Sequence, residues 1–169
     1  MMKPQVKLRA IEPEDLDLLY QIENDQRLWN VGATNVPYSR YTLHDYIATS
    51  CDDIYADRQV RLIVENEVGE AVGLCDLVRF DPQHQRAETG IVILDAKRRQ
   101  GYAAAALREM SKYAVQVLHL HQLYAVVAAD NEAALSLFLK SGYERKNALK
   151  DWLFDGKKWA DAWVLQSFL

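Results

Sequence analysis

The chain is poor in cysteine and has no long hydrophobic run. Only Cys51 and Cys75 occur among 169 residues, with no CxxC or His/Cys spacing, so we expect no disulfide framework and no metal site. No stretch approaches the roughly 18 uninterrupted apolar residues of a membrane-spanning helix. The opening residues MMKPQVKLRAIEPEDL lack the apolar core of a secretory signal. We therefore expect a cytoplasmic protein with no membrane partner.

Positive charge is also not in excess. Twenty Lys and Arg against 24 Asp and Glu give a formal charge of −4, with a pI near 5.6. This balance argues against nonspecific binding to nucleic acid or to an anionic membrane. Half of the residues are hydrophobic and 26% are charged, as in ordinary globular proteins. With no linker or repeat in the sequence, we expect one domain over 1–169 and no nucleic-acid partner.

Hydrophobic periodicity divides the chain into strands and helices. Pro13 with acidic neighbours is typical of a helix start, and Thr42 with Asp45 resembles a helix-capping arrangement. Asp155-Gly156 is a strong hairpin signal. The pattern indicates an α+β protein with an antiparallel meander in its middle. The predicted elements are strands 6–11, 58–66, 70–80, 86–94, 121–129, 143–155 and 157–169, and helices 12–25, 42–55, 97–118 and 130–142.

Residues 98–110, RRQGYAAAALREM, place positive charge before a glycine and a run of alanines. A helix that begins near Gly101 leaves backbone N–H groups unpaired at its N-terminus, where the helix dipole also favours an anion. Small side chains allow close approach, and Arg98 and Arg99 can add charge-assisted hydrogen bonds. The segment suits a phosphate group, and a plain helix with a solvated basic edge is the alternative. It matches neither GxxxxGK[ST] nor GxGxxG, so no nucleoside triphosphate or dinucleotide is expected.

Two motifs resemble the GNAT family of N-acetyltransferases. RRQGYA at 98–103 resembles the (Q/R)xxGx(G/A) pyrophosphate loop, and NEAALSLFLKSGY at 131–143 resembles the NxxAxxxYxKxGF helix. The stretches HQRAETGIVI and FDGKKWADAWVL look most like spermidine N-acetyltransferases and ribosomal-protein N-terminal acetyltransferases. The resemblance implies the GNAT fold, an α+β fold in βααβββαβαββ order. Its mixed, mostly antiparallel central sheet has about seven strands and is flanked by about four helices.

The resemblance also implies acetyl transfer from acetyl-CoA to a primary amine by direct attack. In the family, the strand equivalent to 89–93 pairs with the pantetheine arm, the loop equivalent to 98–104 takes the pyrophosphate, and the helix from Asn131 flanks the cofactor. The residues expected to contact acetyl-CoA are Ile91, Val92, Ile93, Arg98, Arg99, Gln100, Gly101, Tyr102, Ala103, Ala104, Asn131, Ala134, Phe138 and Lys140.

Direct attack needs a neutral amine, so a group must accept a proton from an ammonium whose pKa is near 10. Glu88 stands where many relatives carry a carboxylate facing the acceptor, and it is the candidate catalytic base, acting directly or through water. The alternative is a structural Glu88 in a cross-strand ion pair, with Arg86 as a possible partner.

Phe138 occupies the position of the family's tyrosine, whose hydroxyl stabilises the departing thiolate. Phenylalanine cannot donate a proton, so that role does not carry over to Phe138. Ser136, Ser141 and Tyr124 are the candidate substitutes. A noncatalytic acyl-CoA-binding module is therefore an alternative function.

A polyamine acceptor would need carboxylates and aromatic faces. Spermidine enzymes carry an acidic pair before Pro-Tyr, whereas this chain has Asn35-Val36 there, and a protein N-terminus is the alternative acceptor. The last hairpin contains three tryptophans, Trp152, Trp159 and Trp163, which suit core packing or, alternatively, the contact of a homo-oligomer. The candidate acceptor residues, which can equally be solvated charges and packing aromatics, are Glu23, Asp25, Trp29, Tyr38, Tyr41 and Asp45.

Overall fold

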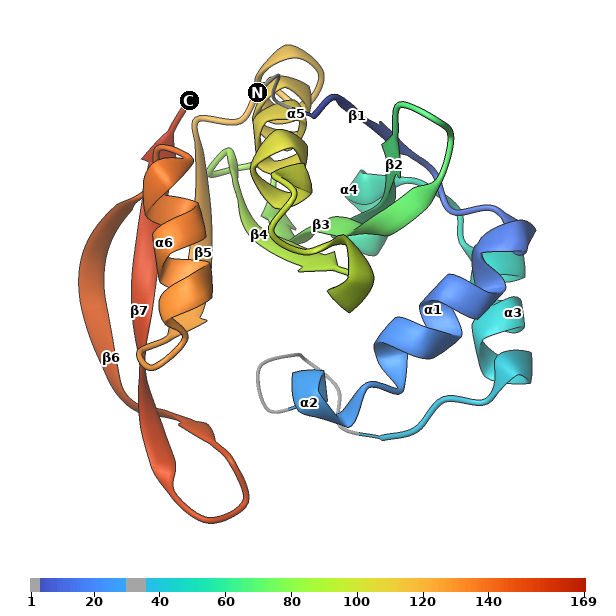
Figure 1. The fold of residues 1–169 in the computed structure, drawn as a ribbon. Coiled ribbons are helices and arrows are strands. Elements are labelled where there is room, and N and C mark those ends of the chain that lie inside the picture. The colour runs from blue at the N-terminus through green and yellow to red at the C-terminus, as the bar shows by residue number, and fades with distance from the viewer. Residues whose placement is uncertain (1–3, 30–35) are drawn as a thin grey trace.

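A single seven-stranded sheet organises the molecule (Figure 1). The computed structural model describes residues 4–29 and 36–169. The strand order is β1-β2-β3-β4-β5-β7-β6, and every neighbouring pair is antiparallel except β4 and β5. The expected mixed, mostly antiparallel sheet is therefore confirmed. Its strands are β1 (Val6–Arg9), β2 (Val60–Asn66), β3 (Ala71–Asp81), β4 (Arg86–Ile93), β5 (Gln122–Ala128), β6 (Glu144–Phe154) and β7 (Trp159–Phe168).

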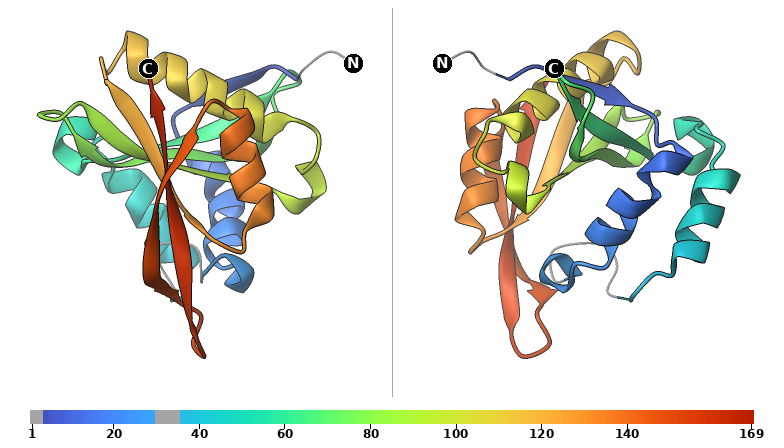
Figure 2. Two further views of the ribbon diagram at one scale, coloured as in Figure 1. Left: turned by 90° about the vertical axis from the view of Figure 1, so that its left-hand side faces the viewer. Right: turned by 45° about the vertical axis from the view of Figure 1, so that its right-hand side comes forward.

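Helices cover both faces of the sheet (Figure 2). Helices α5 and α6 pack on one face, and α1 and α3 pack on the other. No helix among the described residues is long and apolar enough to cross a membrane. The α-helices that the described chain contains are α1 (Leu16–Glu23), α2 (Gln26–Trp29), α3 (Arg40–Thr49), α4 (Ile54–Asp57), α5 (Tyr102–Gln116) and α6 (Glu132–Lys140).

Two hydrophobic cores lie on opposite faces of the sheet. Met110 of α5 and Leu123 of β5 belong to the larger core, and Leu19 of α1 packs in the smaller one. Strand β3 contributes to both, because Leu74 and Cys75 point to opposite faces and both are buried. A sheet covered on both faces explains why the β3 sequence is apolar along most of its length.

The predicted helices over 12–25 and 42–55 both differ from the structure. The first splits into a 3₁₀ turn at Pro13–Asp15 followed by α1 and the one-turn α2. The second begins at Arg40 and ends at Thr49, and its cap is Ser39, whose hydroxyl accepts from the Thr42 N–H at 3.0 Å. The capping role predicted for Thr42 with Asp45 is therefore wrong. These breaks explain why the described chain has six helices rather than about four.

The second half of the chain follows the sequence pattern closely. Asn131 caps α6, with its side chain accepting from the Ala134 N–H. The β6–β7 hairpin turns at Asp155, whose carboxylate accepts from the Lys157 and Lys158 N–H groups, both at 2.9 Å. The core packing expected for the hairpin tryptophans is confirmed for Trp163, which packs on the larger core, whereas Trp152 and Trp159 are 55% and 61% exposed. They lie on a hairpin that projects from the body of the protein (Figure 1).

Candidate active site

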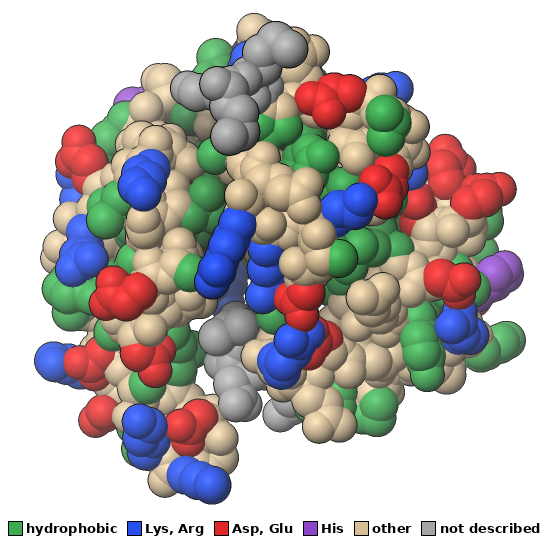
Figure 3. Space-filling view, in the orientation of Figure 1, with side chains coloured by type: hydrophobic (Ala, Val, Ile, Leu, Met, Phe, Trp, Pro, Cys, Tyr) green, Lys and Arg blue, Asp and Glu red, His purple; other side chains and the backbone are tan. Residues whose placement is uncertain are grey.

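The sheet opens between β4 and β5. These parallel strands pair only at Arg86 with Gln122, Ala87 with Leu123 and Glu88 with Tyr124, although β4 continues to Ile93 and β5 to Ala128. The β4 backbone over 89–93 therefore has no strand partner on its β5 side, and it can pair with an extended ligand. A hollow separates the two halves of the protein on the face that Figure 3 shows, with Lys or Arg side chains at its rim.

The loop before α5 has the features of an anion site. Gly101 has φ +88° and precedes the helix, which closes its first hydrogen bond from the Ala105 N–H to the Gly101 carbonyl at 3.1 Å. The N–H groups of Tyr102, Ala103 and Ala104 consequently have no acceptor within the helix. Ala104 is exposed, and the positive end of a 15-residue helix adds a favourable field for an anion.

The charged side chains of this loop have different roles. Arg98 donates from Nε to the Ile93 carbonyl at 3.0 Å and lies 2.8 Å from an Asp95 carboxylate oxygen. It therefore ties the loop to the end of β4. Arg99 and Gln100 are exposed, and Gln100 donates to the Ala96 carbonyl. Arg99 is the residue whose charge stays most available to a diphosphate.

Glu88 stands at the last paired position before the opening. Its carboxylate forms an ion pair with Arg79, and its side chain is 16% exposed. Glu88 therefore forms a cross-strand ion pair, as the alternative prediction expected. The predicted partner, Arg86, was wrong, because Arg86 binds Asp81 at 3.2 Å instead. Burial, followed by the negative charge of Glu88, raises the pKa of Tyr124 on the adjoining strand. An acidic group therefore occupies the point where β4 and β5 separate.

Helix α6 contributes packing more than functional groups. Phe138 is 4% exposed, and its ring lies edge-on to Tyr143 at 5.0 Å between centroids. Ala134 is half-buried and Lys140 is exposed, and the side-chain oxygen of Asn131 is engaged at the helix cap. Contacts of these four residues with acetyl-CoA stay predictions.

Tyr143 is a residue that sequence reasoning missed. Its hydroxyl donates to Thr89 Oγ1 on β4 at 3.0 Å. Because Tyr143 follows α6 and leads into β6, this bond joins the two halves of the sheet at the opening. Burial raises the pKa of Tyr143 to about 12, so its hydroxyl remains a donor. The available signal was the final position of the α6 motif, where the family pattern has Phe and this chain has Tyr.

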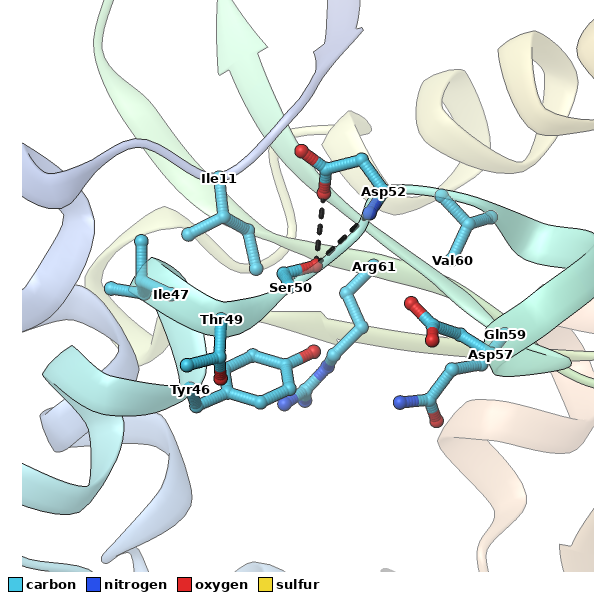
Figure 4. A pocket seen from close by; sticks show the side chains of 10 residues that line it. All are labelled: Ile11, Tyr46, Ile47, Thr49, Ser50, Asp52, Asp57, Gln59, Val60 and Arg61. Atoms are coloured by element: carbon cyan, nitrogen blue, oxygen red, sulfur yellow. Dashed lines mark hydrogen bonds between the residues drawn. The ribbon is translucent and has the colours of Figure 1, made fainter.

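A second group of charges lies on the face of the sheet that carries Glu88. Arg61 of β2 lies 2.7 Å from a Glu23 carboxylate oxygen and 3.4 Å from one of Asp76. On its outer side Arg61 borders a cavity of about 250 Å³ between β2, α3 and α4, together with Tyr46 (Figure 4). Sequence reasoning named Glu23 but missed Arg61 and Asp76, because the register that brings them together is not visible in the sequence.

The other candidate acceptor residues make different kinds of contact. Asp25 binds Arg27 at 2.6 Å, and the Trp29 indole N–H donates to the Glu23 carbonyl at 2.9 Å. Tyr38 packs on the smaller core, whereas Tyr41 and Asp45 are exposed. Asn35, which departs from the spermidine-enzyme pattern, lies outside the described residues.

Comparison with known proteins decides the family. Residues 5–144 match the family described as Acetyltransferase (GNAT) domain. The chain belongs to the GNAT acetyltransferase family. Acetyl-CoA is therefore the acyl donor, and the activity is N-acetyltransfer, as the resemblance implied. The free β4 edge and the loop before α5 are the parts of this GNAT domain that suit an extended thioester with a diphosphate.

Several relatives of this GNAT chain have named activities. The spermidine N(1)-acetyltransferase of Escherichia coli strain K12 is 30% identical over 164 residues, covering 93% of this chain and 82% of the relative. A putative ribosomal N-acetyltransferase of Bacillus subtilis is 28% identical, covering 88% and 83%. The structure of the Vibrio cholerae spermidine N-acetyltransferase with CoA and spermine superimposes with a TM-score of 0.85 at 24% identity. It covers 97% of this chain and 95% of that one.

The backbone at Gly101 gives a direct test of the anion loop. An alanine there would keep φ at +88°, which costs L-residues roughly 1–2 kcal/mol, and its Cβ would lie 3.1 Å from Pro4. We expect Gly101→Ala to raise the KM for acetyl-CoA about tenfold and to leave the KM for the amine unchanged. The control is Gly69→Ala, since Gly69 has φ +78° with no atom within 4 Å of the added Cβ. Equal effects of the two variants on the KM for acetyl-CoA would contradict the assignment.

Proposed function

We propose that this acetyltransferase acetylates a primary amine of a polyamine. The observation that carries the proposal is the excess of carboxylates on the sheet face beside the β4 opening. There Glu88, Asp76 and Glu23 are paired with only two guanidinium groups, those of Arg79 and Arg61. Polycations bind best where carboxylates compensate their charge. The names of the Escherichia coli and Vibrio cholerae relatives support the same acceptor class.

In the proposed reaction, Glu88 accepts a proton from the acceptor ammonium, directly or through water. The neutral amine nitrogen then attacks the thioester carbonyl carbon of acetyl-CoA, and the C–S bond breaks. CoA leaves as a thiolate and takes up, directly or through water, the second proton that the nitrogen loses as it becomes an amide. A thiol with a pKa near 8.5 leaves readily as its anion, so the absence of a hydroxyl at Phe138 is compatible with turnover. The β4 edge, Arg99 and the N–H groups at the start of α5 would hold the donor.

Two other functions remain as alternatives with specific support. The Bacillus subtilis relative, named as a putative ribosomal N-acetyltransferase, favours a protein N-terminus as acceptor. The buried Phe138 favours a noncatalytic acyl-CoA-binding module, because it provides no proton donor.

A homo-oligomer is part of the proposal. Strand β6 is an edge strand whose residues are almost all exposed, and Trp152 and Phe154 on it are more than half exposed. Long exposed edges with apolar side chains are usually covered by another chain. The Vibrio cholerae relative has a structure described as dodecameric. The unpaired thiols of Cys51 and Cys75 fit the reducing cytoplasm in which we place the enzyme.

Thiol release from acetyl-CoA tests the proposal. The acceptor panel contains spermidine, spermine, free amino acids, an aminoglycoside and N-terminal peptides, and acetyl-CoA binding is measured in parallel by calorimetry. We expect turnover with the polyamines and little with the peptides. Turnover confined to peptides would support N-terminal acetylation instead. Acetyl-CoA binding without turnover on any acceptor would favour the binding module.

A further inference from the structure

Asp76 lies one strand away from the free edge of β4, and only a glycine separates it from that edge. The registers place Arg61 opposite Asp76 and Asp76 opposite Gly90, so all three positions face the same side of the sheet. A Cβ added at Gly90 would lie 3.9 Å from Asp76 Oδ2. The space above Gly90 is therefore within reach of this carboxylate and directly beside the strand on which the thioester is expected to lie.

The charges around Asp76 do not balance. Arg61 lies 2.7 Å from a Glu23 carboxylate oxygen and 3.4 Å from one of Asp76, so two carboxylates share one guanidinium. Two carboxylates and one guanidinium leave one excess negative charge, and the Asp76 side chain is only 20% exposed. Burial raises the pKa of Asp76, although Arg61 acts against this shift. A proton or a ligand cation can neutralise the excess charge.

We propose that Asp76 binds an ammonium group of the acceptor in the space above Gly90, next to the amine that reacts at Glu88. This inference rests on the proposed polyamine acceptor. Because Val78 lies opposite Glu88, Asp76 and Glu88 are diagonal neighbours on adjacent strands, a separation of about 7–8 Å. Neighbouring nitrogens of a linear polyamine are about 5–6 Å apart across three or four methylenes. One carboxylate can therefore take each of two successive nitrogens.

The binding of this ammonium is coupled to the protonation of Asp76. The charged and titratable groups that face Asp76 are Arg61 from β2, Glu23 from α1 and Tyr46 from α3. Strand β4 presents Gly90 directly opposite and Glu88 diagonally. A cation at this place favours the ionised carboxylate. Polyamine binding therefore releases a proton from Asp76 where part of this carboxyl is protonated, and the affinity rises as pH rises through its raised pKa.

Asp76→Asn removes the charge and keeps the shape of the side chain. With the full-length protein, we expect the KM for spermidine to rise about tenfold, with the KM for acetyl-CoA and the KM for propylamine, which has one nitrogen, unchanged. Calorimetry of spermidine binding to the CoA complex, repeated in buffers of different ionisation enthalpy from about pH 5 to 8, should show proton release with the wild type but not with Asp76→Asn. Asp17→Asn, on α1, where the side chain is 84% exposed, is the matched control and should behave as the wild type.

Gly90→Ala is a second variant in case Asp76→Asn folds poorly. Its methyl group makes only ordinary contacts, the nearest at 3.7 Å, and it fills the proposed ammonium position while leaving Asp76 in place. We expect a higher KM for spermidine than for the wild type, again without a change for propylamine. An unchanged spermidine KM in either folded variant, or an equal rise for propylamine, would overturn the role of Asp76. A wild type that neither binds nor acetylates polyamines would instead refute the proposed function itself.

Discussion

Replacing Glu88 with glutamine is expected to lower kcat by about 10² to 10⁴-fold, the usual contribution of a general base. The amide keeps the size of the side chain but cannot accept the proton of the acceptor ammonium. Because Glu88 lies at the start of the opening, away from the loop before α5, the KM for acetyl-CoA should stay the same. The difference in kcat between the wild type and Glu88→Gln should shrink as pH approaches the amine pKa near 10, where the free amine is already neutral. Initial rates measured from about pH 6 to 10 test both expectations.

Arg79→Gln is the control for the Glu88 variant. It breaks the same ion pair but retains the carboxylate, and Arg79 is 69% exposed, so the folding cost of losing the pair is small. We expect Arg79→Gln to keep most of the activity. Equal losses of kcat in both variants would show that the ion pair, rather than the base, matters. A loss of kcat in Glu88→Gln that stays the same at every pH would also contradict proton transfer to Glu88.

The chemistry that depends on local sequence could be predicted. The loop with Gly101 and the cap at Asn131 lie within short segments, and backbone geometry over a few residues determines both. The turn at Asp155 in the last hairpin is likewise determined by a few neighbouring residues. The two family motifs allowed the reaction to be predicted, because two short patterns in a fixed order along the chain are specific even where each pattern alone is common.

The features that depend on strand register could not be predicted. Arg61, Asp76 and Gly90 are separated by 14 or more positions in the sequence, and they form one row only because β2, β3 and β4 pair in a particular register. A shift of one residue would turn each side chain to the opposite face. The bond from Tyr143 to Thr89 has the same origin, since it spans 54 positions. The helix breaks after Glu23 and Thr49 carry no glycine or proline signal.

The close pairing of β3 with β4 also leads to a prediction for Gly73 of β3. A Cβ there would lie 2.1 Å from the Val92 carbonyl oxygen and 3.0 Å from Ile93 Cα, so β3 and β4 would have to separate. The β2 irregularity between Val64 and Glu65 lies directly beside this position. We expect Gly73→Ala to lower the free energy of unfolding by about 3 kcal/mol, as severe overpacking does. Urea denaturation measures this change.

Gly90→Ala provides the matched comparison on the next strand. It adds the same methyl group to the same sheet, but the nearest atom is Asp76 Cβ at 3.7 Å, so its unfolding curve should overlay that of the wild type. In Gly73→Ala protein that remains folded, the displaced atoms belong to the stretch 89–93 that is expected to pair with pantetheine, so the KM for acetyl-CoA should rise as well. Equal stabilities of the two variants would mean that β4 can shift freely, which is incompatible with a rigid edge that positions the thioester.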